Sequence, residues 1–190
     1  TSNRTRRDLW RLVDALILSA LAVSLIGLYQ YFFTNWVIIG EGVRRILAVY
    51  GSPNNLALYL DRALPLVIAL ALFVEDNRRR VVYVLAAIPI ALCLYLTYSR
   101  GAWLVGLPAG LLFIGFMSGR RARLAIAALL VLAVIVLLPF LQTERGQSFF
   151  QTGTGTGFFR VSVWEAGAAM IRDHPIFGVG LDNFLYEYPK

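Results

Sequence analysis

Arg100 is the residue best placed to do chemistry, because it lies where a membrane is expected. The apolar segment 81–117 is preceded by a basic cluster at 78–80 and followed by another at 120–123, and such clusters usually stay in the cytoplasm. A single straight helix of that length would extend roughly 55 Å, well beyond a hydrocarbon core of about 30 Å. We therefore expect a hairpin with its tip at 97–101. A charge at the outer membrane surface predicts a functional site that holds an anion.

Arg160 is a second candidate for anion binding. It opens an expected amphipathic helix at 159–173, and Arg172 lies near the other end of that helix. Two guanidinium groups that face one cavity would form a clamp suited to a diphosphate. Two simpler roles stay open: a lipid-phosphate contact for Arg160, and a snorkelling position without a ligand for Arg100. The apolar stripe of the helix consists of Phe159, Val163, Ala166 and Met170.

Further polar residues could line an outward-facing cavity. Asp61 and Arg62 lie inside an expected span at 56–74, and Asn54 shares a helical face with Asp61. Ser99, next to Arg100, is another candidate. Two interpretations of Asp61 and Arg62 stay open, because the pair could fix helix packing by pairing with each other or could line the cavity.

His174 is the only histidine and therefore a candidate general base. It precedes Pro175, which disfavours a helical conformation at His174, so we expect it to end the helix 159–173 and to contact the last carbonyls. The sequence shows no Ser-His-Asp arrangement and no carboxylate pair at metal-ligand spacing, so neither a metal nor a cofactor is expected. The single cysteine, Cys93, is expected to be buried.

Composition indicates an integral membrane protein. Hydrophobic residues make up 58% of the 190 positions and charged residues 15%, whereas soluble domains carry about 25% charged residues. The net charge of +7 comes largely from three short clusters, at 4–11, 78–80 and 120–123. Membrane topology and anionic lipids explain these clusters better than nucleic acid does.

We expect an all-α polytopic transmembrane helix bundle with about five spans and an external amphipathic helix. Ser52 suits the N-cap of the second span and Pro53 its first position, and no strand pattern is found. The stretch 151–157 is a glycine-rich linker by composition. The expected spans are 12–33, 56–74, 81–97, 102–117 and 124–141. The expected organisation is a first span with an outer loop that contains Arg44 and Arg45 (1–50), a four-span core (51–141) and the start of an external loop (142–190).

Four motifs occur in an order that resembles a known family. The set resembles the O-antigen ligase and O-antigen polymerase superfamily of bacterial inner-membrane proteins, over about 50–190. The resemblance rests on the four motifs together and on their order. The motifs are Gly51-Ser-Pro-Asn-Asn-Leu-Ala57, Leu96-Thr-Tyr-Ser-Arg-Gly-Ala-Trp103, Phe159-Arg-Val-Ser-Val-Trp164 and Asp173-His-Pro-Ile-Phe-Gly-Val-Gly-Leu-Asp-Asn-Phe184.

The resemblance implies a metal-independent inverting glycosyltransferase without a cofactor. Its members move a glycan from undecaprenyl diphosphate, on the periplasmic side, to an acceptor hydroxyl on lipid A-core, a polysaccharide or a protein. Arg100 and Arg160 would then bind the diphosphate. The general-base histidine of the family is expected beyond Lys190, so the resemblance assigns His174 to a turn and makes this stretch catalytically incomplete by itself.

Two rival functions remain at this point. A transporter or lipid-binding module without covalent chemistry would suit Asp61 and Arg62, because transporters place charges at mid-membrane. A scaffold in an envelope assembly is the third possibility. The expected external position of Arg100 and Arg160 favours the transferase. A His-Asn motif soon after Lys190 would favour it too, whereas a further bundle of repeats would favour transport.

Overall fold

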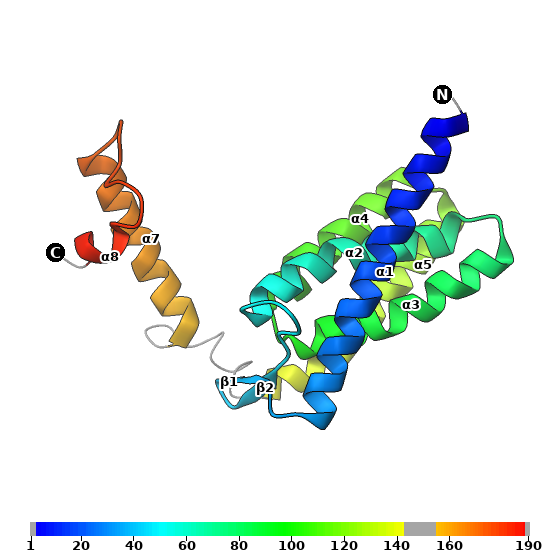
Figure 1. Cartoon of the computed structure of the whole chain (residues 1–190), viewed down its shortest axis with the longest axis horizontal. Coiled ribbons are helices and arrows are strands. Elements are labelled where there is room, and N and C mark those ends of the chain that lie inside the picture. Colours follow the sequence, from blue (N-terminus) through cyan, green and yellow to red (C-terminus); the bar gives the residue numbers. More distant parts are fainter. Residues whose placement is uncertain (1–2, 143–154, 189–190) are drawn as a thin grey trace. The chain divides into compact units, whose positions relative to one another are not determined.

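The computed structural model describes residues 3–142 and 155–188, which form two compact units, Thr1–Leu138 and Pro139–Lys190. Figure 1 shows the elements of each unit. The expected all-α class is confirmed. The first unit contains α1 (Asn3–Phe33), β1 (Ile38–Gly40), β2 (Val43–Arg45), α2 (Pro53–Phe73), α3 (Asn77–Leu96), the π-helical turn η1 (Ala102–Gly106), α4 (Leu107–Met117) and α5 (Arg120–Leu137). The short 3₁₀ turn η2 (Leu138–Gln142) follows, and the second unit adds α7 (Gly155–Asp173) and α8 (Phe184–Glu187).

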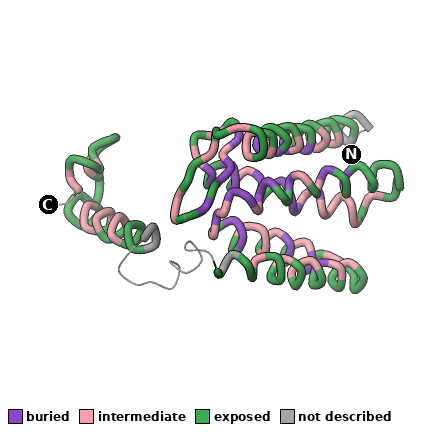
Figure 2. The backbone as a smooth tube through the Cα atoms, turned by 90° about the horizontal axis from the view of Figure 1, so that it is seen from below, coloured by how far each residue is buried: buried purple, intermediate pink, exposed green. Residues whose placement is uncertain are grey.

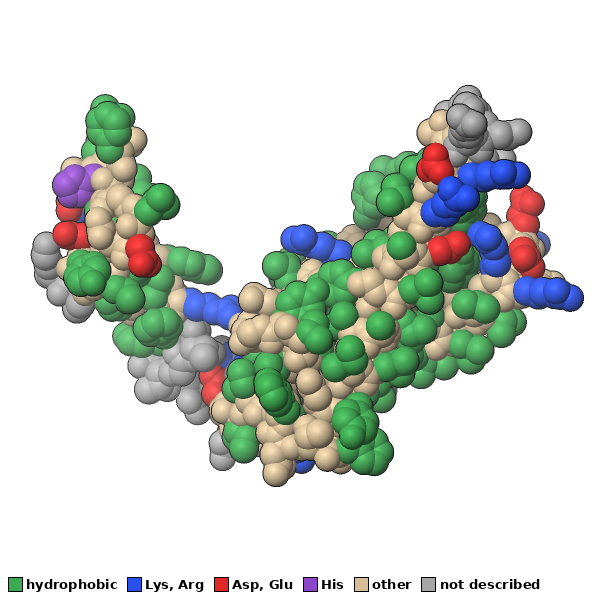
Figure 3. Space-filling view, in the orientation of Figure 1, with side chains coloured by type: hydrophobic (Ala, Val, Ile, Leu, Met, Phe, Trp, Pro, Cys, Tyr) green, Lys and Arg blue, Asp and Glu red, His purple; other side chains and the backbone are tan. Residues whose placement is uncertain are grey.

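Each of the five expected apolar segments forms a helix. In the described part of the chain, three helices are long and apolar enough to cross a membrane: Arg7–Phe33, Pro53–Phe73 and Asn77–Leu96. The segment Ala102–Met117 is apolar but shorter. Large hydrophobic side chains cover much of the outer surface of this unit, as Figure 3 shows in green. A surface of this kind suits a lipid environment, so the chain is an integral membrane protein.

The three basic clusters meet at one end of the first unit. The Arg79 guanidinium lies 5.1 Å from the centre of the Trp10 ring, which joins the start of α3 to the start of α1. Phe73 at the end of α2 and Arg120 at the start of α5 line one groove. The β1–β2 hairpin lies at the opposite end, as Figure 1 shows. The spacing of the basic clusters predicts this arrangement, with all three clusters at one end of the unit and the connecting turns at the other.

Small residues allow α1 to approach α3 closely. Ala20, Ser24 and Gly27 are buried on one face of α1, and a Cβ atom at Gly27 would lie 3.2 Å from Sγ of Cys93. Figure 2 shows buried residues, in purple, within the helices of the first unit. Helices in membranes associate through such small-residue faces, because lipid offers no hydrophobic driving force between them. Cys93 is buried, as expected.

α2 packs closely against two glycines, one just before α4 and one in its first turn. A Cβ atom at Gly106 would lie 2.8 Å from Cγ of Asp61, and one at Gly110 would lie 2.7 Å from Cγ of Pro65. The backbone just before α4 is π-helical, and the Leu107 N–H donates to the carbonyl of Ala102. Pro108 accounts for this turn, because it has no N–H for a regular helical bond and its ring would clash with the preceding turn.

The outer loop contains a β-hairpin, so the expectation of no strands is wrong. Ile38 pairs with Arg45 and Gly40 with Val43 in antiparallel register. Glu41 and Gly42 form the two-residue turn with φ of 51° and 74°, as a type I′ turn requires. Strands of three residues are too short to show an alternating pattern in sequence.

The second unit is built on α7. The helix ends at Asp173, as Pro175 predicts, but it begins at Gly155 rather than at 159. Residues 151–154 of the expected linker lie outside the described residues. Phe184 of α8 lies next to Gly167, since a Cβ atom there would be 3.9 Å from the Phe184 ring. Three members of the expected stripe are half-buried and Phe159 is exposed.

Candidate functional site

A tight reversal after α3 places Arg100 at the end of the first unit that carries the β1–β2 hairpin. The Thr97 hydroxyl donates to the Leu94 carbonyl at 2.7 Å and accepts from the Ser99 N–H at 3.3 Å. Tyr98 adopts a left-handed conformation with φ of 50°. The Trp103 N–H then donates to the Ser99 carbonyl at 3.1 Å and starts the next helical segment. The predicted hairpin tip at 97–101 is confirmed.

Arg100 forms an ion pair with Glu41 at this end. Nη2 of Arg100 donates to Oε2 of Glu41 at 2.6 Å. The two side chains are only 14% and 19% exposed, so solvent screens this pair less than a surface pair. The charge-assisted bond fixes the guanidinium relative to the β1–β2 turn.

The sequence reasoning missed Glu41. One signal was available, because Glu41 is the only carboxylate in the outer loop and stands before Gly42 in a potential turn. Nothing in the sequence, however, links that turn to a residue 59 positions later.

Arg45 is a buried arginine that joins three elements. Its Nε donates to the Thr97 carbonyl at 2.8 Å, and its Nη2 donates to Oδ1 of Asn54 at 2.8 Å. The neighbouring Ile46 N–H donates to the Leu96 carbonyl at 3.1 Å. A cation is favourable at the C-terminus of α3, where the helix dipole is negative. Arg45 therefore fixes the hairpin to the end of α3 and the start of α2. Sequence reasoning had placed it in the loop without a role.

An aromatic group supports the same turn. The Tyr95 and Trp103 rings stack with centroids 5.1 Å apart, and Tyr98 lies 5.8 Å from each. Nε1 of Trp103 donates to the Leu94 carbonyl at 3.2 Å. Burial raises the pKa of Tyr98, with smaller contributions from Tyr31 and Tyr95. The phenol therefore stays protonated at neutral pH and adds no negative charge beside Arg100.

Arg44 ties the hairpin to α1. Its Nη2 donates to the carbonyls of Tyr31 and Thr34 at 3.3 and 3.4 Å. Its guanidinium also lies 5.2 Å from the centre of the Tyr31 ring, within range of a cation–π interaction. Arg44 and Arg45 thus attach the hairpin to the helices. Arg100 instead pairs with the carboxylate of Glu41 in the hairpin turn.

The predicted cavity residues separate into two groups. Asn54 and Ser99 lie beside the Thr97–Arg100 turn through their contacts with Arg45 and Thr97. Asp61 is buried against Gly106, whereas Arg62 is exposed. Asp61 and Arg62 form no ion pair with each other, unlike Arg100 and Glu41. Asp61 thus takes part in helix packing without pairing with Arg62.

Arg160 and Arg172 lie on α7, in the second unit, and both are exposed. Arg172 is in the last turn, where a cation is favourable next to the helix dipole. The expected clamp of Arg100 with Arg160 stays a prediction, because the two arginines belong to different compact units.

His174 ends α7 through its backbone. Its N–H donates to the Met170 carbonyl at 2.9 Å, and its own carbonyl accepts from the Gly178 N–H at 3.0 Å. The side chain is exposed and makes no hydrogen bond to any residue in the ranges that the structure describes. The expected contact with the last carbonyls is therefore made by the main chain and not by the imidazole.

We expect His174→Asn and His174→Gln to retain most transfer activity, because the helix end depends on backbone bonds. Loss of a general base would instead lower the rate by about 10² to 10⁴. The measurement is glycan transfer by the protein that contains this chain, normalised to membrane-inserted protein. A fall in that range with unchanged expression would make His174 the base.

Comparison with known proteins adds one match. Residues 84–190, more than half of the chain, match the O-antigen ligase family. The matched part includes the Thr97–Arg100 turn, α7 and α8. Comparisons with curated proteins and with solved structures gave no match. Both the ordered motifs and the matched range lead to one conclusion: this membrane chain belongs to the O-antigen ligase family.

Proposed function

We propose that this chain is part of a membrane glycosyltransferase that moves a glycan from undecaprenyl diphosphate to an acceptor hydroxyl at the periplasmic face. The acceptor would be a lipid A-core, a polysaccharide or a protein. The main support is the position of Arg100. It is largely buried and held by Glu41, at the end of the first unit opposite the three basic clusters.

The proposed chemistry needs charge stabilisation more than bond activation. As the acceptor oxygen attacks the anomeric carbon, the bond from that carbon to the diphosphate oxygen breaks and negative charge grows on the diphosphate. Arg100, together with Arg160, would stabilise this charge without a metal. The acceptor proton would pass to a histidine beyond Lys190. One direct displacement of this kind inverts the anomeric configuration.

Glu41 would act as a positioning residue for Arg100. A guanidinium is planar, and its paired donors match phosphate oxygens only in the correct orientation. Glu41 is held by a tight turn, and Arg44 and Arg45 attach that turn to α1, α2 and α3. The guanidinium is therefore oriented before the donor arrives, which is the condition for effective electrostatic catalysis.

The test of this function is transfer in proteoliposomes that contain the full-length protein and a lipid-linked glycan donor. We expect a covalent glycan–acceptor product, with transfer unchanged by EDTA because arginines supply the positive charge. Movement of the donor between leaflets without a covalent product would instead support the transporter. Loss of transfer in EDTA, restored by a divalent cation, would contradict the metal-independent mechanism.

The proposed periplasmic site predicts the sidedness of the chain. In intact cells, an impermeant thiol reagent should label Gly101→Cys but not Arg79→Cys or Arg121→Cys, in a background where Cys93 is alanine. Thr154→Cys, which lies outside the described residues, should be labelled with Gly101→Cys. The reverse pattern would place the Thr97–Arg100 turn in the cytoplasm and would overturn the proposed location.

A further inference from the structure

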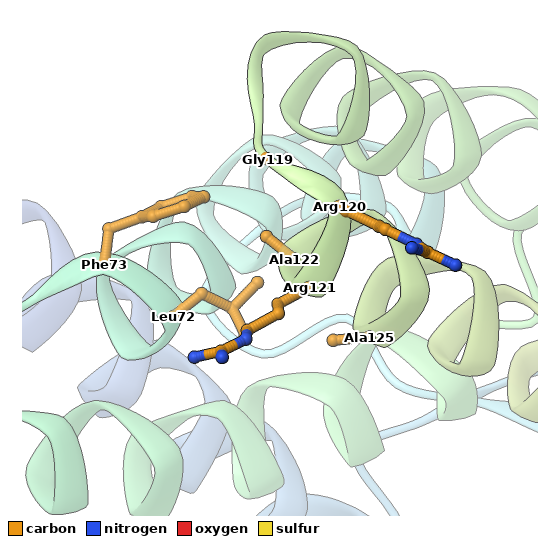
Figure 4. Close-up of a pocket in the computed structure, with 7 residues that line it drawn as sticks. All are labelled: Leu72, Phe73, Gly119, Arg120, Arg121, Ala122 and Ala125. Atoms are coloured by element: carbon orange, nitrogen blue, oxygen red, sulfur yellow. The ribbon is translucent and has the colours of Figure 1, made fainter.

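A groove lined by both apolar and basic residues lies far from the Thr97–Arg100 turn. It has a volume of about 540 Å³ and runs between the end of α2 and the start of α5. Figure 4 shows Leu72, Phe73 and the Arg121 side chain on the same side, with Arg120 at the opposite edge. The floor is formed by Ala122 and Ala125. The small side chains of these alanines leave the space open.

The two arginines that line the groove have no counter-ion among the described residues. Arg120 and Arg121 are both exposed, and neither forms an ion pair or hydrogen bond there. The first turn of α5 contains no acidic residue, and Gly119 at its N-cap provides no side-chain bond. Cations at a helix N-terminus oppose the helix dipole. An anion in the groove would relieve this repulsion.

Neighbouring carboxylates do not fill that role. Glu75 and Asp76 follow α2 directly, but neither lines the groove. Asp76 instead accepts a hydrogen bond from the Arg78 N–H at 2.8 Å and caps α3. The carboxylates that follow α2 therefore do not neutralise the charge of Arg120 and Arg121 in the groove.

The apolar side of the groove continues onto the lipid-facing surface. Phe73 is 52% exposed, and Leu124, next to the groove, is 63% exposed. The groove also lies at the end of the unit that carries the basic clusters, where apolar helices meet water. A ligand that combines a phosphate with an apolar chain matches both the arginines and the apolar residues of the groove, whereas inorganic phosphate matches only the arginines.

We propose that this groove binds an anionic phospholipid, with its phosphate at Arg120 and Arg121 and its upper acyl chain along Leu72 and Phe73. The lipid belongs to the leaflet on the side of the basic clusters. It would bridge the end of α2 and the start of α5, which are distant in sequence. This site is separate from the proposed glycan transfer and does not depend on it.

The experiment is lipid retention by the purified chain, with phosphatidylglycerol as the probe. The chain is reconstituted in bilayers of phosphatidylcholine and phosphatidylglycerol, extracted in mild detergent, and its co-purified lipids are counted by native mass spectrometry. We expect enrichment of phosphatidylglycerol over its share of the bilayer. The Arg120→Gln/Arg121→Gln variant should lose at least about tenfold of that preference, since it removes charge-assisted hydrogen bonds to the lipid phosphate that arginines outside the groove cannot form.

Two further variants make the result specific. Arg78→Gln/Arg123→Gln removes the same charge outside the groove lining and should keep the preference. Ala122→Trp keeps the arginines but fills the groove, and should also lose bound phosphatidylglycerol. Equal losses in both double-glutamine variants would reduce the effect to general surface charge and would overturn the proposal. Displacement of the lipid by inorganic phosphate would also overturn it, because the site would then recognise phosphate alone.

Discussion

Arg100→Ala abolishes glycan transfer while the protein still inserts in the membrane: this is the largest effect we expect. Removal of one preorganised donor to a developing anion usually lowers the rate by about 10² to 10³. Arg100→Lys should also be poor, because an ammonium group cannot present a planar pair of donors. The measurement is transfer by the full-length variants, normalised to inserted protein.

The matched control for this prediction is Arg123→Ala. Arg123 is exposed and belongs to the basic cluster at the opposite end of the unit. It should retain transfer. Arg100→Ala removes the ion pair between Arg100 and Glu41. The double variant Glu41→Ala/Arg100→Ala removes both charges, so comparison of its membrane insertion with that of Arg100→Ala shows whether the remaining carboxylate disturbs folding. Transfer by Arg100→Lys at the normal rate would reduce this arginine to a point charge or a lipid anchor.

Reversal of the charge at Glu41 should have the second largest effect. Glu41→Arg replaces the carboxylate beside Arg100 with a second cation, at side chains that are less than one-fifth exposed, so we expect the hairpin to detach from Arg100 and transfer to be lost. Glu41→Gln keeps an acceptor for Nη2 and should retain part of the activity. Glu41→Ala should retain less. The measurements are kcat and KM for the lipid-linked donor.

The split between kcat and KM separates two roles of Glu41. If Glu41 is a positioning residue, its replacement should lower kcat, because the Arg100 guanidinium is then no longer aligned in the transition state. The swap Glu41→Arg/Arg100→Glu restores an ion pair but should not restore transfer, because the cation then lies on the hairpin. A lower KM with an unchanged kcat in Glu41→Gln would instead mean that this carboxylate competes with the donor diphosphate.

Local signals made much of the fold predictable. Ser52 and Pro53 start α2 as expected, and the Ser52 side chain accepts from the Asn55 N–H at 3.2 Å. Pro175 correctly predicts the end of α7. The reversal at Thr97–Arg100 follows from segment length and flanking charge alone. These features depend on nearby residues and on the thickness of a bilayer, so one sequence contains the information.

The surroundings of the candidate site were less predictable. Arg100 meets Glu41 across 59 positions and Arg45 meets Thr97 across 52, and no local pattern specifies such distant partners. Of the two interpretations of Asp61 and Arg62, an ion pair between them is not formed in the structure, for a related reason. Adjacent residues on a helix point in different directions, and the packing of α2 against Gly106 then buries one of them and exposes the other.

The most direct test of the central claim is binding of an undecaprenyl-diphosphate-linked glycan to the full-length protein in nanodiscs, without acceptor. We expect Arg100→Ala to weaken binding at least about tenfold, since a charge-assisted contact contributes about 1.5 to 3 kcal/mol. Undecaprenol without the diphosphate should not compete, and Arg123→Ala should bind as the wild type does. Equal affinity of wild type and Arg100→Ala for the donor, with transfer intact, would contradict the assignment of Arg100 to the diphosphate.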